Sequence, residues 1–283
     1  MKLISTLRMG QTGWAAILGN GILNLTGFKD AETLKEALEI GVLPELGAVL
    51  ETAKPDLHMS DMTLLPVIPD PGKILCIGLN YQKHKQETGR PDVDNPTVFT
   101  RFADSQVAHL APLIKPVVSD RFDYEGEMAV VIGKGGRAIS EEDALSHVAG
   151  YACYNDGSVR DWQRHTMQFT PGKTFPGTGA FGPCLVTTDQ VGDYRKLPIQ
   201  TRLNGEVVQD ASLADLIFPV ERLIAYCSTF TPLAAGDVIL SGTPGGVGDK
   251  REPPLYMTDG DRVEVEIGML GTLVNPVVDE SKL

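Results

Sequence analysis

The chain has 283 residues, of which 42% are hydrophobic and 22% charged, so it can bury one large domain or a main domain with a small appendage. Its formal net charge is −12 and it has no run of lysine or arginine, which argues against a nucleic-acid partner because a phosphate backbone requires a basic face. No stretch is apolar for the roughly 18 residues of a membrane-spanning helix, so we expect no membrane partner. The four cysteines are scattered without a C-x-x-C pair, which argues against structural zinc.

The first 70 residues differ in pattern from the rest. Short apolar runs interrupted by glycine and asparagine predict a small hairpin unit, and residues 31–40 have the apolar spacing of a helix. Prolines at positions 66, 69 and 71 then predict a linker, because proline lacks the amide hydrogen that a strand needs. We therefore expect a small N-terminal domain over residues 1–70 and a main domain over residues 71–283.

Short strands dominate the predicted elements from residue 73 onward. Alternating or β-branched runs predict strands at residues 74–78, 125–133, 150–154, 183–187, 199–203, 237–241 and 262–267. Helices are fewer: Ser140 is placed to cap one, and Pro219 opens another with apolar residues at helical spacing. Because strands do not alternate regularly with helices, the sequence predicts a mainly β, α+β fold and disfavours a doubly wound parallel sheet.

Glu125 and Glu127 are the first candidate functional residues. In a strand, side chains at i and i+2 point to the same face, with their roots about 7 Å apart, which suits two oxygen ligands converging on one hard divalent cation. Asp156 ends an apolar run that begins at residue 150 and could supply a third carboxylate. A solvated strand face and a turn-forming aspartate are the alternatives.

His84 and Glu87 follow the predicted strand at 74–78. If this polar segment is helical, the two residues share a face at i, i+3, so the carboxylate can orient the imidazole and favour its protonated form. The imidazole could then deprotonate a water. The alternative is an exposed polar turn, and the polarity of the segment suits a mobile lid.

Two further positions could bind an anionic substrate. Lys173 could serve a carboxylate or an oxyanion, or it could be an ordinary surface lysine. Thr243 lies in a glycine-rich turn over residues 241–248, where backbone can approach a ligand closely and a hydroxyl and N–H are available. A plain hairpin loop is the alternative there.

Together these motifs resemble the fumarylacetoacetate hydrolase family over about residues 73–278. The stretches that carry the resemblance occur in a family-like order and spacing: IGLNYxxHxxE (77–87), YEGEMAVVIG (124–133), NDGSVRDWQ (155–163), GKTF (172–175), LNGEVVQ (203–209), SGTPGGVG (241–248) and GDRVEVEI (260–267).

The resemblance implies a twisted mixed-β roll with a small N-terminal domain, usually assembled as a homodimer. Three carboxylates match the family's metal ligands: Glu125, Glu127 and Asp156. Two residues match a water-activating catalytic pair on a lid: His84 and Glu87. Three residues match substrate-binding and oxyanion groups, the lysine being catalytic: Gln163, Lys173 and Thr243.

The chain departs from the family near the expected mouth of the substrate site. Many members carry Phe-x-Lys-Pro where this chain has Phe99-Thr-Arg101-Phe102, and a glycine-rich loop that commonly follows is replaced at residues 108–112. Because an arginine can bind a carboxylate through two hydrogen bonds, we predict that Arg101 binds substrate. These departures leave the substrate class open.

The resemblance implies a metal-dependent hydrolase that cleaves a carbon–carbon bond in a small β-diketo acid of the acylpyruvate type, with Mg²⁺ as the cofactor, or Mn²⁺ or Ca²⁺. Decarboxylation of oxaloacetate or isomerisation of a dienoate is the alternative, since both pass through an enolate at the same metal site. A protein that only holds a metal is a third possibility. We expect a cytoplasmic location, or a peroxisomal one if the source is a eukaryote, because the chain ends in Ser281-Lys282-Leu283.

Overall fold

The computed structural model describes residues 1–89 and 93–283. Within them, the largest sheet has 11 strands and combines parallel with antiparallel pairs. Nine strands follow one another across it: β3 (Gly21–Asn24), β2 (Gln11–Leu18), β1 (Lys2–Arg8), β13 (Gly179–Thr187), β11 (Val148–Asp156), β10 (Gly126–Ile132), β16 (Val238–Leu240), β5 (Ile74–Gly78) and β6 (Thr97–Arg101). Two more attach at the side, β4 (Thr63–Leu64) to β1 and β7 (Gln106–Ala108) to β13.

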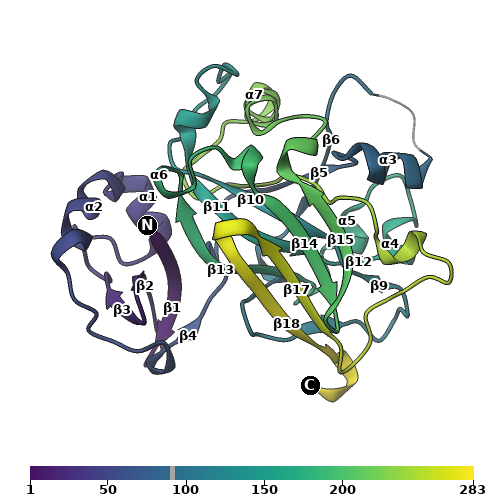
Figure 1. Ribbon diagram of the computed structural model, residues 1–283, viewed down its shortest axis with the longest axis horizontal. Coiled ribbons are helices and arrows are strands. Elements are labelled where there is room, and N and C mark those ends of the chain that lie inside the picture. Colours follow the sequence, from purple (N-terminus) through teal and green to yellow (C-terminus); the bar gives the residue numbers. More distant parts are fainter. Residues whose placement is uncertain (90–92) are drawn as a thin grey trace.

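A second sheet packs against this one (Figure 1). Its five strands are β15 (Glu206–Ser212), β14 (Pro198–Leu203), β17 (Arg262–Ile267), β18 (Gly271–Asp279) and β8 (Leu113–Lys115). A short ribbon pairs β12 (Ser158–Val159) with β9 (Phe122–Asp123). The predicted mixed-β roll is therefore confirmed.

The alternation of side chains along β10 explains the layered core. All seven residues of this strand are buried. Met128 and Val130 pack in the cluster shared with the second sheet, whereas Ala129 and Val131 pack in another cluster with Trp14. The strand therefore has an apolar layer on each face, which is why the sequence over 128–132 is continuously apolar.

Helices are short, and the first of them packs Leu34 and Leu38 into the cluster that contains Trp14 of the large sheet. The helices are α1 (Leu34–Ile40), α2 (Leu43–Thr52), α3 (Gln82–Thr88), α4 (Arg160–Gln163), α5 (Thr170–Lys173), α6 (Thr188–Val191) and α7 (Val220–Phe230). A capping box of Thr33 and Glu36 starts α1. None of the described helices has the length and apolarity needed to cross a membrane.

Most predicted elements occur where expected, with one exception. The strands at 74–78 and 262–267 have the predicted bounds, and α7 begins directly after Pro219. The helix predicted after Ser140 is wrong: the Ser140 hydroxyl accepts the Asp143 N–H, but only a 3₁₀ turn, Ala144–His147, forms. Pairing of Val148 with Ile132 then begins β11 and ends the turn.

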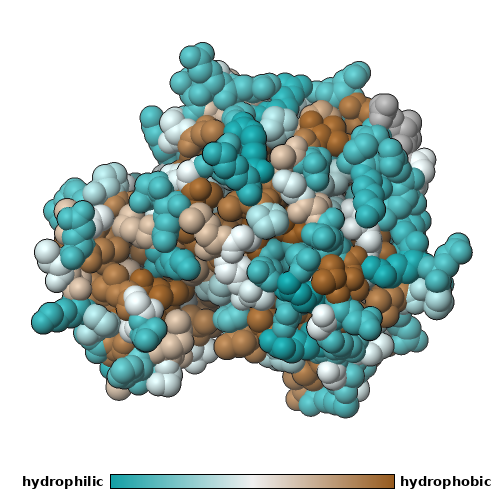
Figure 2. Space-filling view, viewed as in Figure 1, coloured by the Kyte–Doolittle hydropathy of each residue, from teal (hydrophilic) through white to brown (hydrophobic). Residues whose placement is uncertain are grey.

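The N-terminal section joins the main sheet through β1, which pairs with β13. Figure 2 shows hydrophobic residues over these N-terminal strands at the left, and hydrophilic residues over most of the upper and right edges. The domain division at residue 70 and the homodimer stay predictions.

Candidate active site

Three buried carboxylates meet where β10 and β11 run side by side. The register places Gly126 opposite Asn155, and the Asp156 N–H donates to the Glu125 carbonyl at 2.8 Å. Ligand atoms of Glu125, Glu127 and Asp156 all lie within 4.8 Å of one another. Glu125 directly precedes β10 and is buried, so the solvated strand face considered from the sequence is excluded.

The carboxylates of this cluster differ in the positive charges that surround them: Glu125 has two cationic partners, whereas Glu127 has none among the described residues. Burial raises the pKa of Glu127 well above its ordinary value, and the nearby charges of Asp156 and Glu125 raise it further. Burial also acts to raise the pKa of Glu125, but Lys173 and Arg160 outweigh it and lower that pKa to about 2. Among the described residues Glu127 has no ion pair, and one of its oxygens accepts the Gly242 N–H at 2.8 Å. A divalent cation would supply the missing charge, so this all-oxygen donor set fits Mg²⁺ or Mn²⁺.

Lys173 lies at the end of α5 and joins two of the carboxylates. Its Nζ is 2.6 Å from Glu125 Oε2 and 2.6 Å from Asp156 Oδ2. Burial acts to lower the pKa of Lys173, but Asp156 and Glu125 raise it overall, so the ammonium keeps its charge. Gly172 permits this placement, since a Cβ there would meet the backbone nitrogen of Gln163 at 2.3 Å.

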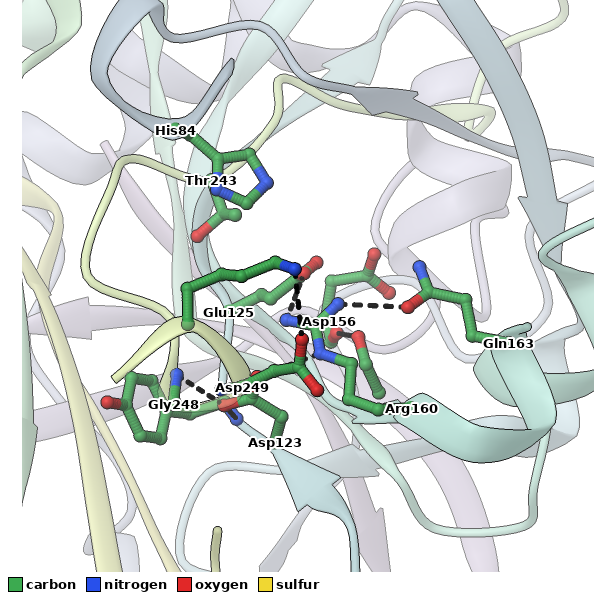
Figure 3. A network of polar contacts seen from close by, with 12 residues as sticks. His84, Asp123, Glu125, Asp156, Arg160, Gln163, Thr243, Gly248 and Asp249 are labelled. Carbon is green, nitrogen blue, oxygen red and sulfur yellow. Dashed lines mark hydrogen bonds and ion pairs between the residues drawn. The ribbon is translucent and has the colours of Figure 1, made fainter. Parts of the chain in front are cut away.

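Arg160, which the sequence analysis did not single out, is a central residue of the site (Figure 3). Its Nε donates to Asp123 Oδ2 at 2.8 Å, and its Nη1 donates to Gln163 Oε1 at 3.0 Å. Its Nη2 lies 2.7 Å from Glu125 Oε1. Arg160 and Gln163 sit at i, i+3 on α4, and this spacing within NDGSVRDWQ was the signal that could have found the arginine.

His84 and Glu87 lie on α3, as the helical interpretation predicts. The His84 Nδ1 is 2.7 Å from Glu87 Oε1, and Glu87 Oε2 accepts the Gly246 N–H at 3.0 Å. His84 is buried, so in this arrangement α3 closes over the site, and the exposed polar turn is excluded.

Thr243 lies in the glycine-rich turn, and its hydroxyl is already engaged. Oγ1 donates to the Gly126 carbonyl at 3.0 Å and accepts a hydrogen bond from Gln209 Nε2 at 2.8 Å. The side chain therefore fixes the turn against β10, which leaves the backbone as the part of Thr243 that can meet a substrate.

A cavity of about 130 Å³ joins these groups. Six of the nine residues predicted for the site line it: His84, Glu125, Glu127, Gln163, Lys173 and Thr243. Asp156 and Glu87 stand behind this lining, each in contact with a residue that forms it. Figure 3 shows His84 and Thr243 on one side of the carboxylate cluster and Gln163 on another.

The structure does not bring Arg101 to the cavity. Its guanidinium is fully buried and pairs with Asp156. Nε donates to Ser105 Oγ at 3.1 Å and Nη2 donates to Thr178 Oγ1 at 3.0 Å. These contacts argue against the predicted substrate-binding role, because they occupy the donors within the protein, and they make Arg101 a support for Asp156.

Known proteins resemble the chain over most of its length. The model of the fumarylacetoacetate (FAA) hydrolase C-terminal family matches residues 73–278. "Oxaloacetate tautomerase FAHD2A, mitochondrial" from Bos taurus is 41% identical over 266 residues, with 92% of this chain and 85% of the relative covered. The Homo sapiens protein of the same name gives the same figures.

Solved structures share the fold. A putative HpcE protein from Mycobacterium smegmatis superposes with a TM-score of 0.89 at 31% identity, covering 99% of this chain and 100% of that one. A maleylpyruvate hydrolase from Sphingobium sp. SYK-6, in complex with manganese(II) and pyruvate, gives a TM-score of 0.81 at 25% identity and covers 99% of each chain.

These comparisons correct one expectation and establish another. The relatives from Bos taurus and Homo sapiens are named as mitochondrial proteins, which contradicts the cytoplasmic location expected from the sequence and its peroxisomal alternative. The family match spans well over half of the chain and agrees with the fold. The chain belongs to the fumarylacetoacetate hydrolase family.

Proposed function

We propose that this chain is a divalent-metal-dependent enzyme that interconverts the keto and enol forms of oxaloacetate or a closely related 2-oxo dicarboxylate. The observation that carries the proposal is the buried carboxylate cluster facing the same small cavity as the His84–Glu87 pair. Relatives at 41% identity are named oxaloacetate tautomerases, which favours this enolate chemistry over the hydrolysis of acylpyruvates that we expected first.

The residues that would hold the cation are Glu125, Glu127 and Asp156. Bound there, a divalent cation supplies Lewis-acid polarisation of the 2-oxo acid. Lys173 keeps an ammonium beside two of these carboxylates, and Arg160 adds a second fixed positive charge at Glu125. Both positive charges stabilise the negative charge that develops on the oxygen attached to C2 of the substrate.

His84 is placed to move the proton. Because Nδ1 is held by Glu87, Nε2 is the ring nitrogen that remains for the substrate. The imidazole accepts a proton from C3, the C3–H electron pair forms the C2–C3 double bond, the π electron pair of the carbonyl moves onto its oxygen, and that oxygen takes up a proton from solvent water. Glu87 stabilises the imidazolium that forms, and return of the proton to C3 regenerates the keto form.

Exchange of the C3 hydrogens with deuterium oxide, followed by nuclear magnetic resonance, tests this proposal directly. With Mg²⁺ or Mn²⁺ present, the protein should accelerate exchange in oxaloacetate well above the rate of CO₂ release, and chelation should abolish the effect. If no exchange is accelerated with either metal, the tautomerase proposal is wrong.

Hydrolysis of a β-diketo acid remains the second candidate. It is favoured by the likeness to the maleylpyruvate hydrolase and by an imidazole–carboxylate pair that suits water activation. Cleavage of an acylpyruvate without acceleration of enol exchange in oxaloacetate would decide for the hydrolase.

A further inference from the structure

The outer part of the cavity contains a second group of charges. Arg164, Asp249 and Lys250 line the same cavity as the carboxylate cluster, and none of them belongs to the groups described above. Arg164 Nη1 donates to Asp249 Oδ1 at 3.0 Å, and its Nη2 pairs with the other oxygen. Lys250 Nζ lies farther from Asp249, 3.7 Å from Oδ2.

Two cations therefore share one carboxylate at this end of the cavity. Asp249 is fixed: its side chain is 6% exposed, Oδ1 accepts the Tyr256 hydroxyl at 2.9 Å, and its N–H donates to Asp123 Oδ2 at 3.0 Å. The side chains of Arg164 and Lys250 are 47% and 34% exposed, so both can turn toward a ligand. Among the described contacts, Asp249 balances only one of the two positive charges of Arg164 and Lys250, so a net charge of one remains at this end of the cavity.

The size of the cavity limits how far a ligand can extend. A cavity of roughly 150 Å³ holds a molecule of the size of benzene, and this one measures about 130 Å³. The Phe99 and Phe169 rings, 5.5 Å apart, form an apolar part of the lining of the same cavity. A short ligand with its 2-oxo acid at the inner end would therefore place its other end near Arg164 and Lys250.

We propose that Lys250 and Arg164 form a subsite for the distal carboxylate of a four-carbon dicarboxylate, and that Asp249 holds both cations in place when no ligand is bound. The inference deepens the proposed function and rests on it for the choice of the 2-oxo acid end. It makes the chain selective for dicarboxylates over monocarboxylates of the same length, because a monocarboxylate leaves the outer positive charge without a partner.

The test compares two ligands that differ only in the distal carboxylate. Malate and 2-hydroxybutyrate would be titrated by calorimetry into the full chain with Mn²⁺ bound. The wild type should bind malate at least tenfold more tightly, the usual scale for a hydrogen bond to a charged group. Lys250→Gln should lose about tenfold for malate and less than twofold for 2-hydroxybutyrate, whereas Lys250→Arg should bind both as the wild type does.

Asp249→Asn should change the affinity for malate in the opposite direction to Lys250→Gln. Removing the shared carboxylate frees both cations, so malate should bind several-fold more tightly while 2-hydroxybutyrate does not change. Lys196→Gln, which removes one exposed positive charge on a different element, is the matched control and should alter neither.

Each contrary outcome is informative. Equal binding of the two ligands by the wild type, equal losses in Lys250→Gln, or weaker malate binding in Asp249→Asn would overturn the subsite. These are binding measurements, so they are separate from turnover: a wild type that prefers malate but does not accelerate exchange in oxaloacetate would retain the subsite and lose the proposed function.

Discussion

The Nδ1 atom of His84 lies 2.7 Å from Oε1 of Glu87, three residues further along the seven-residue helix α3. The second oxygen of Glu87 accepts the Gly246 N–H at 3.0 Å, so the same carboxylate that orients the imidazole also ties α3 to the glycine-rich turn. Closure of α3 and orientation of His84 are therefore coupled through one side chain.

Replacement of His84 by alanine should lower kcat for enol exchange by about 10²-fold or more, which is the usual scale for losing a general base. The affinity for Mn²⁺ should barely change, because His84 is not among the three clustered carboxylates. Gln82→Ala, at an exposed position of the same helix, is the control and should behave as the wild type. A collapse of metal affinity in His84→Ala, measured by calorimetry, would make His84 a ligand instead of a base.

The stabilisation of the protein by bound metal should depend on Glu127 and not on acidic residues elsewhere on the surface. Saturating Mn²⁺ should raise the free energy of unfolding of the wild type, by about 2.7 kcal/mol at 100 times the Kd. Glu127→Gln should lose most of this gain. Without metal the variant should be at least as stable as the wild type, because burial and two neighbouring carboxylates disfavour the ionised Glu127. Glu206→Gln, at an exposed position, should keep the full metal effect, and a full effect in Glu127→Gln would exclude Glu127 as a ligand.

The carboxylate cluster could be predicted from the sequence because it depends on local periodicity. A strand places Glu125 and Glu127 on one face, and Asp156 ends the neighbouring strand, so the three positions follow once the two strands pair. The core strands were predictable for the same reason, since their apolar residues recur at the strand period or run continuously.

The contacts around Arg160 and Arg101 could not be predicted in this way. Asp123 joins Arg160 to the turn that contains Gly248. Arg160 is 37 residues away from Asp123 in the sequence, and Gly248 is 125 residues away from it. Likewise, the arginine at 101 could be predicted to bind a carboxylate, because a guanidinium can form two hydrogen bonds, but only the folded structure shows that this carboxylate is Asp156. Long-range partners are set by packing, which local patterns do not contain.

Arg101→Lys should reduce stability and leave substrate discrimination unchanged. Lysine cannot reproduce the separate donors to Ser105 and Thr178, and we expect a loss of about 2 kcal/mol in the free energy of unfolding. Arg222→Lys, whose surface pair with Glu141 spans 3.4 Å, should cost less than about 0.5 kcal/mol. Unchanged stability together with a raised KM for dicarboxylates would return Arg101 to the substrate-binding role that the sequence suggested.

The Asp249 carboxylate should make stability depend on acid pH. Burial acts to raise its pKa, but the hydrogen bonds from Arg164 and Tyr256 outweigh this and lower the pKa to about 2, below its ordinary value of 3.8. A carboxyl group whose pKa is depressed by folding stabilises the native state above the unfolded pKa, and this contribution is lost as the pH falls toward the folded value. The wild type should therefore be more stable than Asp249→Asn at about pH 6, and the difference should shrink as the pH is lowered from about 4.5 toward 3.

Urea unfolding of both proteins across this range measures the difference, with Asp210→Asn, at an exposed position, as the control for general acid effects. A difference that stays constant or grows on acidification would mean that Asp249 is not held ionised by Arg164, and the shared-carboxylate arrangement at the outer end of the cavity would lose its basis.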